Sequence, residues 1–285
     1  MEETLKPPIN SEELRRFLAE DMPAGDITTE PIVGAERYAR GELLAKAALT
    51  LAGTEVFAAV FRLLDPEAQI EMSAAEGEEI EPGRIPIRVR ARARALLGGE
   101  RTALNLVQRM SGIATATRRY VKAVEGTGAR ILDTRKTMPG LRSLDKYAVA
   151  VGGGQNHRRD LSHAVLIKEN HIRVAGGVKA ALEAVAPQRG RAAWIEIEVT
   201  NQDELWAAIE GAPDVILLDN MTPVQTAACV GIVRESGKQI LTEASGGITL
   251  ANVRSYAEAG VDWISIGALT HSTPSVDLSF EIEPE

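Results

Sequence analysis

The sequence predicts an α/β protein in which a parallel sheet or barrel of strand–helix units follows a smaller α+β domain. Two observations lead to this fold class. Short apolar runs of strand-like composition recur in the last two thirds of the 285-residue chain, with helical patterns between them. These runs end in polar, charged or glycine-rich groups, as barrel strands do at the face that carries active sites.

The first third of the chain predicts a short helix, a loop, and strands around a second helix. The first helix begins at Asn10 or Ser11, with Glu13 placed for a capping box. Proline, glycine and aspartate predict a loop over residues 21–29. Two segments alternate as strands do, Tyr38–Leu51 and Ile85–Leu97. A helical pattern lies between them, over Thr54–Leu64.

The second of these strands carries an arginine at every other position, which places the four arginines on one face of a sheet. We interpret this face as solvated or as an interface, in preference to a direct substrate contact. The four residues are Arg88, Arg90, Arg92 and Arg94.

From Glu100 the pattern changes to a long helix, Glu100–Val124, relaxed at Ser111–Gly112, and then to alternating strands and helices. This order predicts parallel strands with helices outside them. The seven expected strands lie around Ile131, Val149, Val165, Ile195, Val215, Ile240 and Trp263.

The carboxyl ends of these seven runs carry polar, charged or glycine residues that could form a binding or catalytic site. Active sites of barrels form there, from loops that follow several different strands. In chain order the groups are Thr134–Lys136, Gly152–His157, Lys168, Glu198, Asp219–Asn220, Glu243–Gly247 and Gly267–Ala268.

Charge is distributed unevenly along the chain. The protein has a net charge of −8, yet residues 130–173 hold nine basic against four acidic side chains, a local charge of +5. A cationic pocket in an acidic protein indicates a small anionic ligand, whereas a nucleic-acid binder would carry a uniformly basic surface. Arg135, Lys136, Arg158 and Lys168 are the candidates for binding carboxylates or phosphates. We interpret Arg142 and Lys146, on a helical pattern, as surface residues.

Two carboxylates, Glu198 and Asp219, close apolar strands. Such a group is costly to bury unless it meets a cation, a metal or developing positive charge. Mg²⁺ or an oxocarbenium-like centre would satisfy this requirement, and so would an ion pair with Lys168 or Arg158 inside the barrel.

Glycine-rich segments follow the last two expected strands, Ser245–Gly247 and Ile266–Ala268. Such loops often hold phosphate, because glycine lets backbone N–H groups approach an anion closely. The histidines match no common zinc spacing, and we favour His157, beside Arg158, for an anion contact.

Composition limits the class of protein and its cellular compartment. A hydrophobic content of 45% and a charged content of 25% are ordinary for globular proteins. No apolar run approaches the roughly 20 residues that cross a bilayer, and the acidic start lacks a signal-peptide core. The single cysteine, Cys229, excludes an internal disulfide and is expected to be buried and inert. We therefore expect a cytoplasmic, soluble protein.

Taken together, these motifs resemble the quinolinate phosphoribosyltransferase family, the carboxylating nicotinate-nucleotide pyrophosphorylases. The resemblance is collinear over nearly the whole chain, with Arg159–Asp160 as a slight departure. It rests on GDIT at 25–28, ERTALN at 100–105, SGIAT at 111–115, DTRKT at 133–137, GGG at 152–154 with NHR at 156–158, LIK at 166–168, LDN at 218–220, EASGGI at 243–248 and IGALTHS at 266–272.

The resemblance implies an N-terminal α/β sandwich domain at 1–110, an incomplete seven-stranded α/β barrel at 111–270, and a tail at 271–285 that returns to the first domain. It further implies a homodimer in which one subunit's first domain caps the partner's barrel, so that Arg101 reaches the partner's site.

The implied substrates are quinolinate and phosphoribosyl pyrophosphate, with Mg²⁺ as cofactor. The resemblance places Arg135, His157, Arg158 and Lys168 on the pyridine dicarboxylate. It places Lys136, Glu198, Asp219, Ser245, Gly246, Gly247 and Gly267 on phosphoribosyl pyrophosphate and its Mg²⁺, and His271 near a phosphate. Thr134, Ile266 and Ala268 are further implied substrate-binding residues. The implied catalytic residues are Lys136, Glu198 and Asp219, with the two carboxylates beside the sugar and the metal.

Three alternatives remain open at this point. A nicotinate phosphoribosyltransferase or a molybdenum-locus paralogue would share most motifs. A Schiff-base aldolase would use Lys168 or Lys136 as nucleophile. A non-catalytic protein would bind the dicarboxylate without releasing pyrophosphate.

Overall fold

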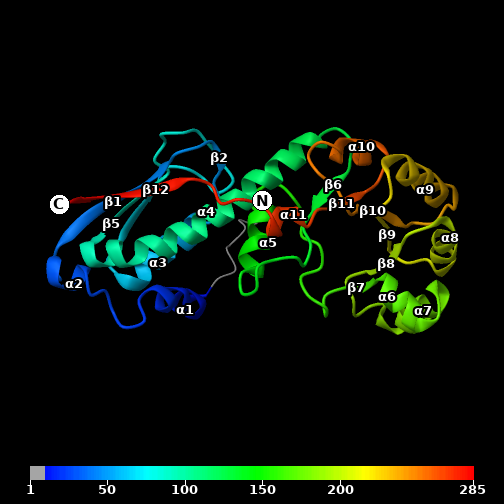
Figure 1. Ribbon diagram of the computed structural model, residues 1–285, viewed down its shortest axis with the longest axis horizontal. Coiled ribbons are helices and arrows are strands. Elements are labelled where there is room, and N and C mark those ends of the chain that lie inside the picture. Colours follow the sequence, from blue (N-terminus) through cyan, green and yellow to red (C-terminus); the bar gives the residue numbers. More distant parts are fainter. Residues whose placement is uncertain (1–9) are drawn as a thin grey trace. The chain divides into compact units, whose positions relative to one another are not determined.

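The computed structural model of the protein describes residues 10–285 (Figure 1). The start of the chain, including the proline-rich residues before Asn10, lies outside the described part. The chain divides into two compact units. The first contains the residues up to Arg118 together with Thr137–Gly153 and Ser272–Glu285, and the second contains Arg119–Lys136 and Gly154–His271.

The first unit is built on a four-stranded antiparallel sheet. The strand order is β12-β1-β5-β3, so the last strand of the chain pairs with the first along its whole length. Figure 1 shows this pairing as a red strand beside a blue one. The strands are β1 (Tyr38–Ala45), β3 (Gln69–Met72), β5 (Ile87–Arg92) and β12 (Leu278–Pro284), and β2 (Leu49–Thr50) pairs separately with β4 (Glu79–Ile80).

Helices cover one face of this sheet, and their boundaries follow from local sequence. Asn10 caps the first helix, with the Glu13 side chain completing the capping box. Phe57 and Phe61 from α3 pack against Phe280 of β12, with ring centroids 5.4 and 5.2 Å away. The helices of this unit are α1 (Ser11–Asp21), α2 (Thr29–Ile32), α3 (Thr54–Leu64), α5 (Arg142–Val151) and most of α4 (Ala93–Ala123).

Three expectations about these elements are wrong in detail. The first alternating segment is two strands, because the chain leaves the sheet at residues 46–48. The arginine strand ends at Arg92, and Arg94 lies on the long helix, which begins at Ala93 because alanine and leucine dominate from there. This helix also continues through Gly112, which is buried against the backbone of Pro274.

The remaining arginines form the solvated face that the sequence predicts. Arg88 pairs with Glu42 at 2.7 Å, and Arg90 pairs with Glu285 at 2.7 Å. The first ion pair joins the neighbouring strands β5 and β1, and the second reaches across β1 to the residue after β12, on the face away from α3.

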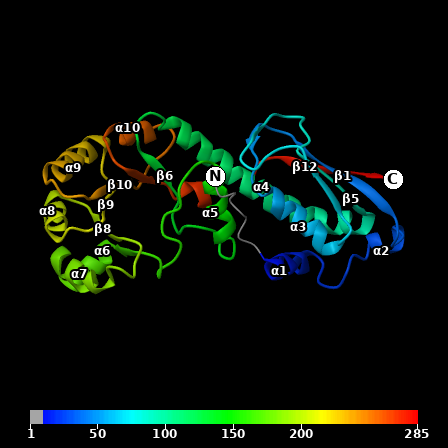
Figure 2. The ribbon, with the colours of Figure 1, turned by 180° about the vertical axis from the view of Figure 1, so that it is seen from behind.

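The second unit is built on a parallel sheet, and the α/β fold class is confirmed. Its six strands have the order β6-β11-β10-β9-β8-β7. Figure 2, seen from behind, shows α8 and α9 along the outer side of β8 to β10. The strands are β6 (Arg130–Leu132), β7 (Val165–Ile167), β8 (Ile195–Val199), β9 (Val215–Asp219), β10 (Leu241–Ser245) and β11 (Trp263–Ser265), and the helices are α6 (Glu169–Ala175), α7 (Val178–Val185), α8 (Gln202–Gly211), α9 (Pro223–Glu235), α10 (Val253–Glu258) and α11 (Ala268–His271), with the 3₁₀ turn η1 (Ala186–Gln188).

The expected seventh strand is absent from the described residues. The run around Val149 is helix α5, because Leu144, Tyr147, Ala148 and Val151 recur at helical spacing and are buried. Gln155 takes the seventh place with one parallel bridge to Leu132. Within residues 10–285, β6 and β7 do not pair with each other, so the barrel is incomplete. No helix in the described part of the chain is long and apolar enough to cross a membrane.

Candidate active site

A cavity of about 660 Å³ opens in the second unit at the carboxyl ends of its strands. All but one of the site residues proposed from the sequence line it, and the exception is Arg101. The lining residues are Thr134, Arg135, Lys136, His157, Arg158, Leu166, Lys168, Glu198, Leu217, Asp219, Asn220, Glu243, Ser245, Gly246, Gly247, Ile248, Thr249, Ser265, Ile266, Gly267, Ala268 and His271.

Strand alternation decides which side chains face this cavity. The register pairs Ser245 with Asp219 and with Ser265, so these residues project to the same side of the sheet. Glu196 and Glu198 share this side, since successive side chains of a strand point to opposite faces. The interior therefore has layers, with Glu198 at the mouth and Glu196 one layer below it.

The two carboxylates at the mouth already have partners. The Lys168 Nζ lies 2.9 Å from Glu198, which is the ion pair that the sequence left open as an alternative. The side chain of Asn220 donates to the Asp219 carboxylate at 2.6 Å. Both carboxylates still line the cavity, so their remaining oxygen lone pairs are available to a ligand.

Two arginines lie together deeper in the cavity. Arg158 is only 6% exposed, and burial together with the neighbouring Arg135 lowers its pKa, while Glu196 opposes this effect. The Nε of Arg135 is buried and has no hydrogen-bond partner among the described residues. Like charges at close range with an unsatisfied buried donor favour an anionic ligand here.

The loop after β6 is tied to the helix after β11. The backbone N–H of Lys136 donates to the Thr134 hydroxyl at 3.1 Å, and the Thr270 hydroxyl donates to the Lys136 carbonyl at 2.8 Å. A Cβ at Gly267 would lie 2.9 Å from the Lys136 side chain and 3.2 Å from His271. Glycine is therefore required for this close approach.

The loop after β10 has two successive residues in the left-handed region. Gly246 has a φ of +94° and Gly247 a φ of +62°. A Cβ at Gly246 would collide with the side chain of Asn220, whereas a Cβ at Gly247 would meet nothing within 4 Å. The loop therefore leaves backbone exposed to the cavity, as a phosphate-binding loop requires.

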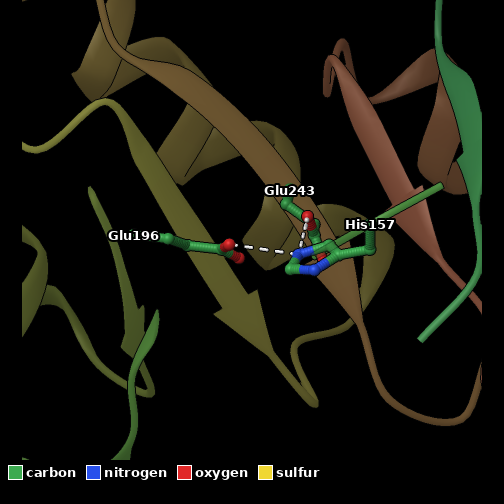
Figure 3. Close-up of side chains that lie close together, drawn as sticks. All are labelled: His157, Glu196 and Glu243. Carbon is green, nitrogen blue, oxygen red and sulfur yellow. Dashed lines mark ion pairs between the residues drawn. The ribbon is translucent and has the colours of Figure 1, made fainter. Parts of the chain in front are cut away.

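Below the mouth lies a buried cluster of His157, Glu196 and Glu243 (Figure 3). The Nε2 of His157 is 3.1 Å from the Glu196 carboxylate and 3.3 Å from that of Glu243. Both glutamates are fully buried, and His157 is 5% exposed. The Trp194 indole N–H donates to Glu196 at 3.0 Å, and its ring meets His157 edge-on, with centroids 5.5 Å apart.

The cluster retains protons at neutral pH. Burial lowers the pKa of His157, but the carboxylates of Glu196 and Glu243 outweigh burial and raise that pKa to about 10. Burial and the charge of Glu196 raise the pKa of Glu243. The His157 Nδ1 accepts the Arg158 backbone N–H at 2.8 Å, so the ring proton lies on Nε2, which faces the two carboxylates.

His157 lines the cavity and both its ring nitrogens face protein groups, and an anion contact of its side chain stays a prediction. One sequence expectation is wrong. Lys146 is buried and not on the surface, since its stretch of α5 packs inward. Arg101 is exposed in the first unit, where its nearest ion-pair partner is Glu100 at 3.9 Å. Cys229 is buried as expected, with its Sγ 3.7 Å from the Met221 sulfur.

Glu243 matters most among the lining residues that the sequence did not assign to the site. The sequence groups it with Ser245–Gly247 at a strand end, and it lies two residues before Ser245, so the period of two places both on the same interior face. Glu196 lies two residues before Glu198 and shares its face for the same reason. The other lining residues that were not assigned are Leu166, Leu217, Asn220, Ile248, Thr249 and Ser265.

Comparison with known proteins agrees with this geometry. Residues 26–111 match the family described as "Quinolinate phosphoribosyl transferase, N-terminal domain", and residues 113–281 match its C-terminal domain. The chain is 42% identical over 278 residues to the "Nicotinate-nucleotide pyrophosphorylase [carboxylating]" of Mycobacterium leprae, covering 94% of this chain and 95% of the relative. It is 40% identical over 273 residues to the "Probable nicotinate-nucleotide pyrophosphorylase [carboxylating]" of Bacillus subtilis, with coverages of 94% and 92%.

Solved structures give the same result. The crystal structure of NadC from Streptococcus pyogenes superposes with a TM-score of 0.93 at 34% identity, covering 99% of both chains. Both domains of one family are thus present in order, and the relatives match nearly end to end. The chain belongs to the quinolinate phosphoribosyltransferase family.

Proposed function

We propose that this protein transfers the phosphoribosyl group of phosphoribosyl pyrophosphate to the ring nitrogen of quinolinate, with loss of CO₂, to give nicotinate mononucleotide and pyrophosphate. Family membership supports this activity. The observation in the structure that carries it is the arginine pair at the cavity, in which Arg158 is buried and Arg135 is half-buried with a buried Nε that has no hydrogen-bond partner among the described residues. Two guanidinium groups suit a ligand with two adjacent carboxylates.

In this proposal, Arg135, Arg158 and Lys168 bind the dicarboxylate. The glycine loops Ser245–Gly247 and Ile266–Ala268, with Lys136 and His271, face the phosphates, and Glu198 and Asp219 face the ribose. The open Gly247 supports the phosphate assignment because it leaves backbone accessible, and the close packing of Gly267 brings the side chains of Lys136 and His271 to the same loop.

The donor set at the mouth also fits Mg²⁺. Glu198 and Asp219 provide carboxylate oxygens at one edge of the cavity, and Mg²⁺ prefers one or two carboxylates together with substrate phosphates. These two residues would hold the ion directly or through water. When bound, Mg²⁺ would offset charge on the leaving pyrophosphate. Lys168 would then leave Glu198 for the substrate.

The chemistry needs no protein nucleophile. The quinolinate ring nitrogen attacks C1 of the ribose as the bond to pyrophosphate breaks, and Glu198 and Asp219 favour the positive charge that develops there. The resulting pyridinium accepts the electron pair of the C2–carboxylate bond, CO₂ departs, and C2 takes up a proton. The protein contributes positioning and preorganised charge, so losing one such contact should lower turnover on the order of 10²-fold.

Arg101 has its role across a homodimer in this proposal. It is exposed and does not line the cavity of its own chain, which is consistent with a role in the partner's site. Mixing Arg101→Ala subunits with Lys168→Ala subunits should restore activity, because one of the two sites in a mixed dimer would then be intact. If no mixture gains activity over either variant alone, the cross-subunit assignment is wrong.

We place the reaction in the cytoplasm, on the basis of the single buried cysteine.

The test of the proposed function is product analysis. Purified protein is incubated with phosphoribosyl pyrophosphate, Mg²⁺ and quinolinate labelled at the 2-carboxylate. We expect labelled CO₂ and nicotinate mononucleotide in equal amounts, and none without phosphoribosyl pyrophosphate. Product from nicotinate with none from quinolinate would favour the paralogous phosphoribosyltransferases instead. A borohydride-trapped adduct on Lys168 or Lys136 would favour the aldolase, which the ion pair of Lys168 with Glu198 disfavours.

A further inference from the structure

The buried cluster of His157, Glu196 and Glu243 has no assigned part in the reaction. We propose that these three residues are positioning residues, which hold the backbone and guanidinium of Arg158 in place for a substrate carboxylate. The inference rests on the proposed function and adds residues that act through Arg158.

The loop that carries His157 is fixed from the end of β6. The backbone N–H of His157 donates to the Asp133 carboxylate at 2.9 Å, and the Asn156 side chain donates to its other oxygen at 2.7 Å. Asp133 is fully buried. This anchoring sends the His157 side chain into the interior of the sheet, where the strands supply Glu196 and Glu243 (Figure 3).

The ring of His157 then fixes the next residue. Its Nδ1 accepts the Arg158 backbone N–H at 2.8 Å, and its Nε2 faces the two carboxylates. The Arg158 guanidinium donates to the Ala164 carbonyl at 3.3 Å, and the charge of Glu196 favours its protonated form. Glu196 therefore acts on Arg158 twice: through His157 and as the opposite charge that offsets the nearby Arg135.

The same three residues have the atom types of a metal site, with ligand atoms within 4.8 Å of one another. The hydrogen bond of the ring argues against this use. A histidine that binds metal through Nε2 carries its proton on Nδ1, but this Nδ1 receives an N–H from Arg158. The cluster is therefore built to hold a proton between His157 and the glutamates.

The two glutamates have different contacts in this arrangement. Glu196 accepts the Trp194 indole N–H at 3.0 Å and lies 3.1 Å from the His157 Nε2, whereas Glu243 lies 3.3 Å from that nitrogen. Glutamine keeps the size of glutamate but cannot carry its negative charge. Glu196→Gln and Glu243→Gln each remove one carboxylate that faces the His157 Nε2, so both variants test the cluster.

The test measures KM for both substrates and kcat in the two variants. For Glu196→Gln we expect the quinolinate KM to rise on the order of tenfold, with the phosphoribosyl pyrophosphate KM and kcat within about twofold of wild type. For Glu243→Gln we expect a rise in the quinolinate KM in the same direction, because this residue also faces the His157 Nε2, again with the phosphoribosyl pyrophosphate KM and kcat within about twofold of wild type. Calorimetric binding of quinolinate alone should show the same weakening.

The direction in which KM changes separates a positioning role of Glu196 from an effect of its charge alone. If Glu196 acted only through its charge, its loss would tighten both anionic substrates. A lower KM for both, or an unchanged quinolinate KM, would overturn the proposal. If Glu196→Gln does not fold, His157→Gln is measured in its place, with the same expected rise in quinolinate KM.

Two controls complete the design. Asp262→Asn removes a carboxylate at the amino end of β11, where Asp262 pairs with Arg234 at 2.7 Å, and should leave every KM unchanged.

In wild-type protein, long-range proton–nitrogen NMR should find the His157 proton on Nε2, and purified protein should contain no stoichiometric transition metal. A proton on Nδ1 alone or a bound metal would overturn the proposal. Absence of quinolinate turnover in wild type would instead contradict the proposed function.

Discussion

The glycine pair after β10 allows a matched test of how backbone shape controls the site. Gly246 and Gly247 both have positive φ, at +94° and +62°, and both line the cavity. They differ in what a side chain would meet. A Cβ at Gly246 collides with the Asn220 side chain and lies 3.1 Å from its backbone nitrogen, whereas a Cβ at Gly247 meets nothing within 4 Å.

Both alanine variants carry the cost of a left-handed backbone, about 1–2 kcal/mol. Only Gly246→Ala must also displace Asn220, whose side chain donates to Asp219 at 2.6 Å. In active sites, misplacement by about 1 Å can lower activity on the order of 10²-fold. We therefore expect Gly246→Ala to lose as much free energy of unfolding as Gly247→Ala, or somewhat more. We expect a large loss of kcat/KM for phosphoribosyl pyrophosphate in Gly246→Ala alone.

The assay combines urea unfolding with steady-state kinetics on both variants. The change in the free energy of unfolding gives the cost of the left-handed backbone, and the change in kcat/KM gives the effect of displacing Asn220 and Asp219. Equal losses of kcat/KM in the two variants would refute the reasoning, since the contact with Asn220 would then have no consequence.

Three further predictions concern stability, each measured by denaturant unfolding. Asn10→Ala removes the side chain that accepts the Glu13 N–H at 2.9 Å, and should cost about 1 kcal/mol, whereas an unchanged midpoint would mean that α1 frays in the folded protein. Arg109→Met leaves the fully buried Asp145 without its 2.7 Å partner and should cost about 3–5 kcal/mol, largely recovered by adding Asp145→Leu; no recovery would contradict the ion-pair explanation. Hydrogen bonds from Arg90 and Arg40 lower the pKa of Glu285 from 4.5 to about 2, so the stability that Glu285→Gln removes should be present above pH 4.5 and vanish as the pH falls toward 2; a difference that grows in acid would contradict it.

Strand alternation explains why so much of the cavity could be predicted. Lys168, Glu198 and Asp219 each follow or close an apolar run, and parallel strands bring their carboxyl ends to one edge. The glycine loop after β10 follows by the same argument. Residues within a few positions of a strand end are therefore predictable from local pattern alone.

The features that escaped prediction depend on contacts far apart in sequence. The helix at Val149 has the same apolar composition as a strand, and its spacing of three and four was the distinguishing signal. His157, Glu196 and Glu243 come from a loop and two strands, and only the folded sheet brings them together. The two carboxylates beside His157 could not be predicted for this reason, because its sequence neighbours do not reveal groups on distant strands.

The most direct measurement is a crystal structure of the protein with quinolinate bound. We predict that the two carboxylates of the pyridine lie against Arg135 and Arg158, with the ring nitrogen facing the edge formed by Glu198 and Asp219. Quinolinate bound elsewhere, or held with its ring nitrogen turned away from those two carboxylates, would contradict the proposed site.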